Sequence, residues 1–174
     1  MSNKILMLIS PENFRDEEYF EPKELFEENG YDVITASKPN TGFALGKLGG
    51  EADVDLNFYN SNPEEYDALV LVGGKGCSIF QKDNKAHSKI KEFYDKHKLI
   101  AAICLAPTIL AFAGMLKDRK VTVSNKDGDN IRIIEESGAK YTSNGLVVDK
   151  NIVTASGPEY SRDFAEKIVD LLEN

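Results

Sequence analysis

The residue whose setting best suits chemistry is Cys104, which ends a short apolar run and is followed three residues later by Pro107. Residues 100–103 read Ile-Ala-Ala-Ile, a continuous apolar stretch typical of a parallel strand buried on both faces. Proline is favoured in the first turn of a helix, where its missing N–H is not needed. The pattern predicts a strand, a sharp turn and a helix, with Cys104 at the carboxyl end of the strand.

That position would suit a reactive sulfur. Open α/β sheets place their sites at the carboxyl ends of strands, and the aligned N–H groups at a helix N-terminus favour a thiolate over a thiol. The alternative is that Cys104 is a small buried hydrophobic residue, which is the usual environment of a free cysteine. Its position alone leaves both interpretations open.

A glycine cluster, Gly-Gly-Lys-Gly at residues 73–76, follows the apolar run at residues 68–72. A P-loop needs Ser or Thr directly after Gly-Lys, where Gly76 stands, and a dinucleotide-binding fingerprint needs a third glycine within residues 77–79. Both nucleotide-binding patterns fail on spacing. The glycines instead predict a turn whose backbone N–H groups approach a reacting atom closely.

Composition limits the class of protein. The 174 residues are 41% hydrophobic, with a mean hydropathy of -0.35, which suits one domain over residues 1–174 with a real core. A net charge of -8 argues against nucleic acid as a partner. No apolar stretch is long enough for a membrane span, and we expect neither a membrane partner nor a signal peptide. Two cysteines are too few for a disulfide framework, so the expected location is the cytoplasm.

Strands and helices are expected to alternate and to position these residues. The predicted parallel strands are residues 4–9, 32–36, 68–72 and 100–103, and the predicted helices are residues 14–29, 84–96, 107–114 and a last one after Pro158. The first helix is rich in carboxylates, and we expect Phe20, Leu25 and Phe26 to turn inward from it. This order predicts a doubly wound, mostly parallel α/β sheet with helices on both faces.

The remaining segments are less regular. Residues 37–62 are expected to form a loop and then an irregular hairpin that ends near Leu56. Residues 121–123 suggest a further strand, and Asp129 is expected to cap a helix over residues 130–137. Residues 146–149 and 152–155 flank a tight turn and predict a hairpin near the sheet edge. The only histidines, His87 and His97, lie among lysines and are expected at the surface.

The motifs together resemble the DJ-1/PfpI family over essentially the whole chain. The matching segments are Ile-Leu-Met-Leu-Ile at residues 5–9, Glu18 four residues before Pro22, residues 68–74, Ala-Ile-Cys-Leu-Ala-Pro at residues 102–107, and Thr-Ala-Ser-Gly-Pro at residues 154–158. The resemblance implies a flavodoxin-like three-layer sandwich that forms a homodimer or a higher homo-oligomer. It also implies a reactive cysteine on a strained strand-to-helix elbow.

Carried over residue by residue, the resemblance places the nucleophile at Cys104 and its hydrogen-bonding acid at Glu18. A protonated carboxyl would stabilise the thiolate by donating to it, so burial should raise the pKa of this carboxyl. Otherwise Glu18 is one more exposed carboxylate of an acidic helix. The backbone N–H groups of Gly74 and Leu105 are the expected oxyanion donors.

This chain departs from the family where an imidazole or an extra acid is expected. Leu105 replaces the histidine that follows the cysteine in peptidase-like members, and Ser78 replaces their glutamate from a neighbouring subunit. Ser124 and Ser156 occupy positions where other members carry histidine and arginine. Without a Cys-His dyad to protonate a leaving amine, peptide hydrolysis should be slow.

Two classes of function remain. One is a cysteine-dependent enzyme of the glyoxalase III or deglycase type that acts on small reactive carbonyls or glycated substrates, with no cofactor and no metal. The other is a non-catalytic oxidative-stress sensor or chaperone-like module in which Cys104 is oxidised. Cys77 is a candidate resolving thiol or a loop residue without a chemical role, and Tyr19 and Tyr160 are candidates for the missing base. A flavin-binding carrier is a remote third possibility.

Overall fold

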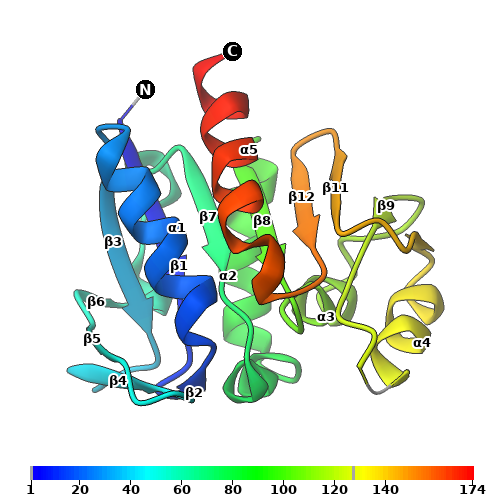
Figure 1. The fold of residues 1–174 in the computed structure, drawn as a ribbon, viewed down its shortest axis with the longest axis horizontal. Helices are drawn as coiled ribbons and strands as arrows, with labels where there is room; N and C mark the ends of the chain where they lie inside the picture. Colours follow the sequence, from blue (N-terminus) through cyan, green and yellow to red (C-terminus); the bar gives the residue numbers. More distant parts are fainter. Residues whose placement is uncertain (1, 127) are drawn as a thin grey trace.

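The core of the fold is a seven-stranded sheet, seen in Figure 1 of the computed structural model, which describes residues 2–126 and 128–174. Its strands are β1 (Lys4–Leu8), β3 (Asp32–Ser37), β6 (Leu56–Asn57), β7 (Ala68–Leu71), β8 (Leu99–Ile103), β11 (Leu146–Asp149) and β12 (Ile152–Ala155). They lie in the order β11-β12-β8-β7-β1-β3-β6. All neighbours are parallel except the edge hairpin β11-β12. The four predicted parallel strands and the edge hairpin are confirmed.

Helices cover both faces of this sheet. The helices α1 (Asp16–Glu28) and α5 (Ser161–Glu173) pack side by side on one face, in front of the sheet in Figure 1, and α2 (Asn84–Asp95) and α3 (Pro107–Phe112) lie behind it. The remaining helix, α4 (Asp129–Glu136), packs against α3. Successive residues of a strand point to opposite faces, so Leu6 and Leu8 join one apolar core while Ile5 and Met7 join the other. The doubly wound α/β class is therefore confirmed.

The irregular hairpin predicted within residues 37–62 is confirmed, and this segment forms further strand pairs that were not expected. The strands β4 (Phe43–Gly46) and β5 (Glu51–Asp53) pair antiparallel and join the short strand β2 (Glu12–Phe14) in a separate sheet, after which β6 extends the edge of the main sheet. The Asp16 carboxylate fixes this unit, because it accepts hydrogen bonds from the backbone N–H groups of Leu48 and Gly50, both at 2.7 Å.

Two local expectations were wrong, on Phe20 and Asp129, and one predicted strand is present with other bounds. Phe20 remains 37% exposed, because it lies against the β4–β5 turn at Gly50 and outside the core. The predicted strand at residues 121–123 is β9 (Lys120–Val121), which pairs with β10 (Lys140–Tyr141) and not with the main sheet. Asp129 does not cap α4; it is the first helical residue, follows Gly128 and pairs with Arg132.

Short 3-10 turns complete the chain: η1 (Phe58–Asn60), η2 (Pro63–Glu65), η3 (Lys75–Phe80) and η4 (Pro158–Tyr160). None of the helices in the described part of the chain has the length and apolar character that a membrane span requires.

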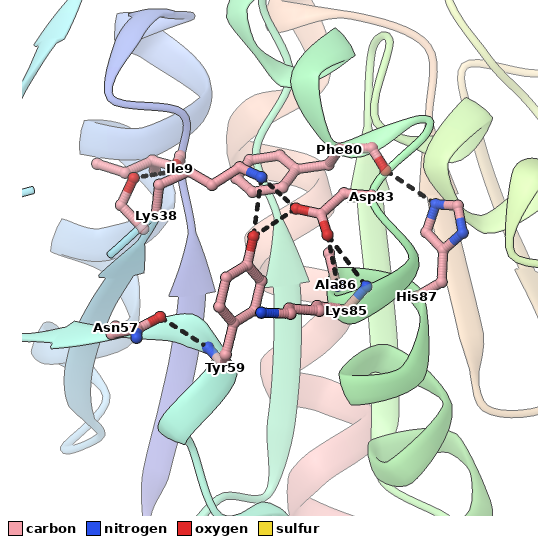
Figure 2. A network of polar contacts seen from close by, with 10 residues as sticks. Ile9, Lys38, Asn57, Tyr59, Phe80, Asp83, Lys85, Ala86 and His87 are labelled. Carbon is pink, nitrogen blue, oxygen red and sulfur yellow. Dashed lines mark hydrogen bonds and ion pairs between the residues drawn. The ribbon is translucent and has the colours of Figure 1, made fainter. Parts of the chain in front are cut away.

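A polar network ties the η3 turn and α2 to the end of β3 (Figure 2). The Lys38 ammonium pairs with the Asp83 carboxylate and donates to the Tyr59 hydroxyl at 2.8 Å, and that hydroxyl donates to Asp83 at 2.5 Å. The same carboxylate caps α2 by accepting from the N–H groups of Lys85 and Ala86. Because η3 directly follows the glycine turn, this network holds that turn in place.

Replacing Asp83 with Asn should destabilise the protein by about 1–3 kcal/mol, because it removes the ion pair with Lys38 and the charged acceptor of the Tyr59 hydroxyl, while the Asn amide oxygen can still cap α2. Its partners lower the pKa of Asp83 to about 2, from an ordinary value of 3.8. The carboxylate therefore stabilises the fold above pH 4, and this contribution is lost as the pH falls toward 2. Urea unfolding of both proteins at pH 7 and pH 3 measures the effect, and a difference that does not shrink at pH 3 would count against it.

Candidate active site

Cys104 lies on a strained turn between β8 and α3. Its φ is +63°, a left-handed conformation that costs a non-glycine residue on the order of 1–3 kcal/mol. Two backbone hydrogen bonds hold it there, since the Cys104 N–H donates to the Ala155 carbonyl at 2.8 Å and the Ser124 N–H donates to the Cys104 carbonyl at 2.8 Å. The predicted strand, turn and helix are confirmed, and the residue is 9% exposed.

Glu18 is carried to the same place by α1. The helix turns its buried face, which includes Tyr19 and Pro22, onto the sheet, and Glu18 is fully buried there. The backbone N–H of Gly73 donates to Glu18 Oε2 at 3.0 Å. The carboxyl contacts the Cys104 thiol closely enough for each group to shift the pKa of the other. The structure thus brings the two predicted residues together.

Glycine is required at positions 73 and 74, in the turn that follows β7. A Cβ on Gly73 would overlap Glu18 Oε2 and lie 2.6 Å from the Ile103 carbonyl oxygen and 2.8 Å from Cys104 Cβ. Gly74 has a φ of +95°, and a Cβ there would lie 2.5 Å from the backbone N of Arg15. The missing side chains let the Gly74 N–H reach the Cys104 sulfur as a hydrogen-bond donor.

Burial controls the protonation of Glu18. Desolvation raises the pKa of this carboxyl from an ordinary 4.5 to about 7, against the opposing hydrogen bond from Gly73. The second oxygen, Oε1, is buried and has no well-formed hydrogen-bond partner. An ionised oxygen in that position would be costly, so the environment favours a neutral carboxyl or a substrate atom that donates to it.

The pKa of the Cys104 thiol differs from what the sequence predicted. Burial, and next the negative charge of Glu18, raise the pKa of the Cys104 thiol to about 12, whereas a thiolate-favouring site was expected. Hydrogen bonds from the Ser124 hydroxyl and the Gly74 N–H act in the opposite direction. The helix that follows has only six residues. Because both pKa values are raised, the pair keeps at least one proton across the neutral range.

The expected oxyanion donors lie on both sides of the sulfur. Gly74 follows β7 and Leu105 follows Cys104, and no backbone acceptor is recorded for the Leu105 N–H in the described part of the chain. The role of these two N–H groups as oxyanion donors stays a prediction.

Serine occupies the space where an imidazole was expected. Ser124 is buried and its hydroxyl acts on the Cys104 sulfur, lowering the pKa of the thiol, but this side chain cannot act as a base at neutral pH. Ser156 donates its backbone N–H to the Gly145 carbonyl at 2.9 Å, and Ser78 is exposed on η3. The Leu105 side chain packs against both apolar cores.

Other candidates lie further away. The Tyr19 hydroxyl is hydrogen-bonded to Thr35 at 2.7 Å, and the Tyr160 ring covers Gly145. Cys77 is buried in η3, where burial raises the pKa of its thiol, and both cysteines are free. His87 is half-buried, with Nε2 lying 2.8 Å from the Phe80 carbonyl oxygen, and His97 is exposed, so only His97 fits a fully surface position.

Arg15 was missed in the sequence. Its backbone N–H donates to the Gly73 carbonyl at 3.1 Å, and its guanidinium forms two hydrogen bonds with Glu17, at 2.8 and 3.1 Å. The charges of Glu18 and Cys104 help raise its pKa, so it is a cation beside the pair. Arg15 is the N-cap residue of α1 and has extended backbone, so helical spacing gave no signal that would place it beside Glu18.

Within residues 2–126 and 128–174, no group of three or more His, Cys, Asp or Glu side chains is arranged to hold a metal ion.

The fold and the elbow together define a flavodoxin-like α/β protein with a cysteine and a buried carboxyl at the carboxyl edge of its central sheet. A model of the DJ-1/PfpI family matches residues 3–171. The chain therefore belongs to the DJ-1/PfpI family.

Individual relatives agree with this assignment. The uncharacterized protein MJ0967 of Methanocaldococcus jannaschii is 42% identical over 98% of this chain and 82% of its own length. Deglycase TK1284 of Thermococcus kodakarensis is 34% identical over 96% of this chain and 98% of its own. The solved structure of a ThiJ/PfpI domain protein from Brachyspira murdochii superimposes with a TM-score of 0.92 at 40% identity, covering 98% of this chain and 96% of that one.

Replacing Glu18 with Gln should stabilise the protein above pH 7. The pKa of Glu18 is about 7 in the folded protein and ordinarily 4.5, so the folded state holds the proton of this carboxyl more tightly. The stability that protonation provides is complete below pH 4.5 and is lost as the pH rises through 7. The gain of the variant should grow by up to about 3 kcal/mol between pH 4.5 and pH 8, as measured by denaturant unfolding.

The matched control is Glu17→Gln, one residue earlier on the helix and partly exposed. Arg15 lowers the pKa of Glu17, so its removal should not produce a gain that grows with pH. Equal pH profiles for the two variants would mean that Glu18 is not protonated near neutral pH.

Proposed function

We propose that this protein is a cysteine-dependent enzyme that acts on small reactive carbonyl compounds, with Cys104 as the nucleophile and Glu18 as the proton carrier. The observation that carries the proposal is the buried pair: a carboxyl with a pKa near neutrality, one of its oxygens unpartnered, in contact with the only thiol on the strained elbow. Relatives named deglycases, at about one-third identity over nearly the whole chain, support the same substrate class.

The first step joins sulfur to the substrate. Glu18 takes the thiol proton as Cys104 attacks the aldehyde carbon of a 2-oxoaldehyde such as methylglyoxal, forming the C–S bond and breaking the C=O π bond. The oxygen that gains the electron pair accepts hydrogen bonds from the N–H groups of Gly74 and Leu105. Glu18 then returns its proton to that oxygen, which gives a hemithioacetal.

The same carboxylate can complete the conversion. Glu18 removes the proton from the carbon attached to sulfur, and the electron pair forms a C=C bond while the neighbouring carbonyl oxygen gains the negative charge. The hydroxyl proton of the first carbon passes to that oxygen, the C=O bond of the first carbon forms, and Glu18 returns its proton to the neighbouring carbon. The product is a thioester of the 2-hydroxy acid. Water adds to the thioester carbonyl, the C–S bond breaks and the thiol regains its proton, so methylglyoxal and water yield lactate.

A glycated amine can enter the same sequence. In an aminocarbinol formed from a 2-oxoaldehyde, attack by sulfur breaks the C–N bond, and Glu18 gives its proton to the departing amine. The resulting hemithioacetal then follows the steps above. Peptide hydrolysis is expected to be slow, because the contacts of the sulfur come from Glu18, Ser124 and Gly74 and include no imidazole.

The second candidate function is oxidation sensing at Cys104. The Ser124 hydroxyl and the Gly74 N–H both donate to the sulfur, and the same donors could bind oxygens added to it. Peroxide would oxidise the deprotonated sulfur to sulfenic acid and be reduced to water. This function requires no turnover of carbonyl substrates, so activity measurements separate the two.

A homodimer or higher homo-oligomer in the cytoplasm remains a prediction. Exposed apolar side chains on α1 and the β4–β5 unit offer a surface for a second copy; they are Phe20, Phe43, Leu45 and Leu48. This face adjoins Asp16 and therefore the helix that carries Glu18.

The Cys104→Ala variant should lose methylglyoxal turnover by at least about 100-fold in kcat/KM, since it removes the atom that forms the covalent intermediate. The matched control is Cys77→Ala, which removes the other free thiol and should keep activity within about threefold. Lactate formation by the purified full chain measures both.

If the Cys104→Ala variant retains turnover, Cys104 is not the nucleophile. If the wild type turns over no 2-oxoaldehyde, glycated amine or peptide while one equivalent of peroxide oxidises Cys104, the sensor function replaces the enzymatic one.

A further inference from the structure

A groove lined by basic side chains lies at the amino end of the central sheet, the end away from Cys104. It consists of two recesses, of about 230 and 460 Å³, that share Tyr94 and Arg119. The cations of the smaller recess are Lys91, Lys117 and Arg119, and those of the larger are Arg119 and Lys150, with His97 beside them. His97 lies two residues before β8, whereas Cys104 follows the other end of that strand.

Acidic neighbours neutralise only part of this charge. Lys91 pairs with Asp95 at 3.0 Å, and Arg119 pairs with Asp149 at 3.3 Å. Both Asp149 oxygens are engaged, because the second accepts from the Lys120 backbone N–H at 2.8 Å. Among the residues that the structure describes, none forms an ion pair with Lys117 or Lys150. Lys117 therefore keeps an uncompensated charge, and Lys150 shares the Asp149 charge with Arg119, in a protein whose net charge is -8.

The groove is held rigidly. The Arg119 side chain is only 13% exposed and donates to the Tyr94 hydroxyl at 2.5 Å, which fixes the wall between the recesses. Asn151 ties the turn that carries Lys150 to the segment before β8, by donating to the Lys98 carbonyl at 3.1 Å and accepting from the Ile100 N–H at 2.8 Å. Groups positioned before the ligand arrives lose little entropy on binding.

We propose that this groove binds a small diphosphate ligand, either inorganic pyrophosphate or the diphosphate of a nucleotide. Lysine ammonium groups bind phosphate oxygens as point charges. Lys117 and Lys150 line different recesses that share Arg119, so contact with both requires a ligand that carries more than one anionic group. The site is separate from the proposed carbonyl chemistry at Cys104 and does not depend on it.

The test is calorimetric titration of the full chain with pyrophosphate, inorganic phosphate and ADP at constant ionic strength. We expect one pyrophosphate per chain, bound at least about tenfold more tightly than inorganic phosphate. The double variant Lys117→Gln/Lys150→Gln should weaken pyrophosphate binding by at least about tenfold. The control Lys47→Gln/Lys126→Gln removes the same charge from two exposed positions outside the groove and should bind as the wild type does.

Three further outcomes are decisive. Tighter binding of ADP than of pyrophosphate would assign the site to nucleotides, and the reverse would assign it to inorganic diphosphate. The Cys104→Ala variant should bind unchanged, because that residue lies at the other end of β8. No pyrophosphate binding, or equal weakening in both double variants, would overturn the proposal by showing that only the overall charge matters.

Discussion

The burial of one carboxyl against one thiol is the constraint on which the site depends. Glu18 and Cys104 are both removed from water, and their pKa values are raised for that reason. Two adjacent buried anions would repel each other strongly, so the pair retains a proton across the neutral range. Which atom holds that proton decides whether the sulfur is inert or nucleophilic. A substrate that enters and accepts hydrogen bonds from Gly74 and Leu105 can shift the balance, because it gives the sulfur an electrophile to attack as Glu18 takes the proton.

The backbone around the pair allows Glu18 and Cys104 to approach each other closely. Gly73 fills the space between Glu18 and Cys104 with backbone alone, and its N–H satisfies one carboxyl oxygen. The left-handed backbone of Cys104 is held by hydrogen bonds to β12 and to the segment after β9, so the surrounding sheet compensates for the strain. The network of Lys38, Asp83 and Tyr59 then fixes the turn that follows the glycines. Each contact joins segments that are distant in sequence.

The sequence predicted the parallel strands and the covering helices because continuous apolar runs and helical periodicity are strong local signals. It also predicted Cys104 at a strand end, but Glu18 only through the family resemblance, since local pattern cannot distinguish a buried glutamate among many exposed ones. The expected lowering of the Cys104 pKa was wrong, because burial and the Glu18 charge raise that pKa and both depend on tertiary contacts. The hairpin of β4 and β5 was predicted, but its pairing with β2 and the strand β6 were not, because these strands are only two to four residues long and depend on distant contacts such as those of Asp16.

The most direct test is the rate of Cys104 alkylation by iodoacetamide as a function of pH, measured in a Cys77→Ala background with and without Glu18→Gln. If Glu18 accepts the thiol proton, reactivity rises in a step near pH 7 when the carboxyl is present. In the Gln variant that step should vanish, leaving a single rise at higher pH set by the buried thiol. Identical profiles for the two proteins, or a sulfur that does not react at neutral pH when Glu18 is present, would contradict the account.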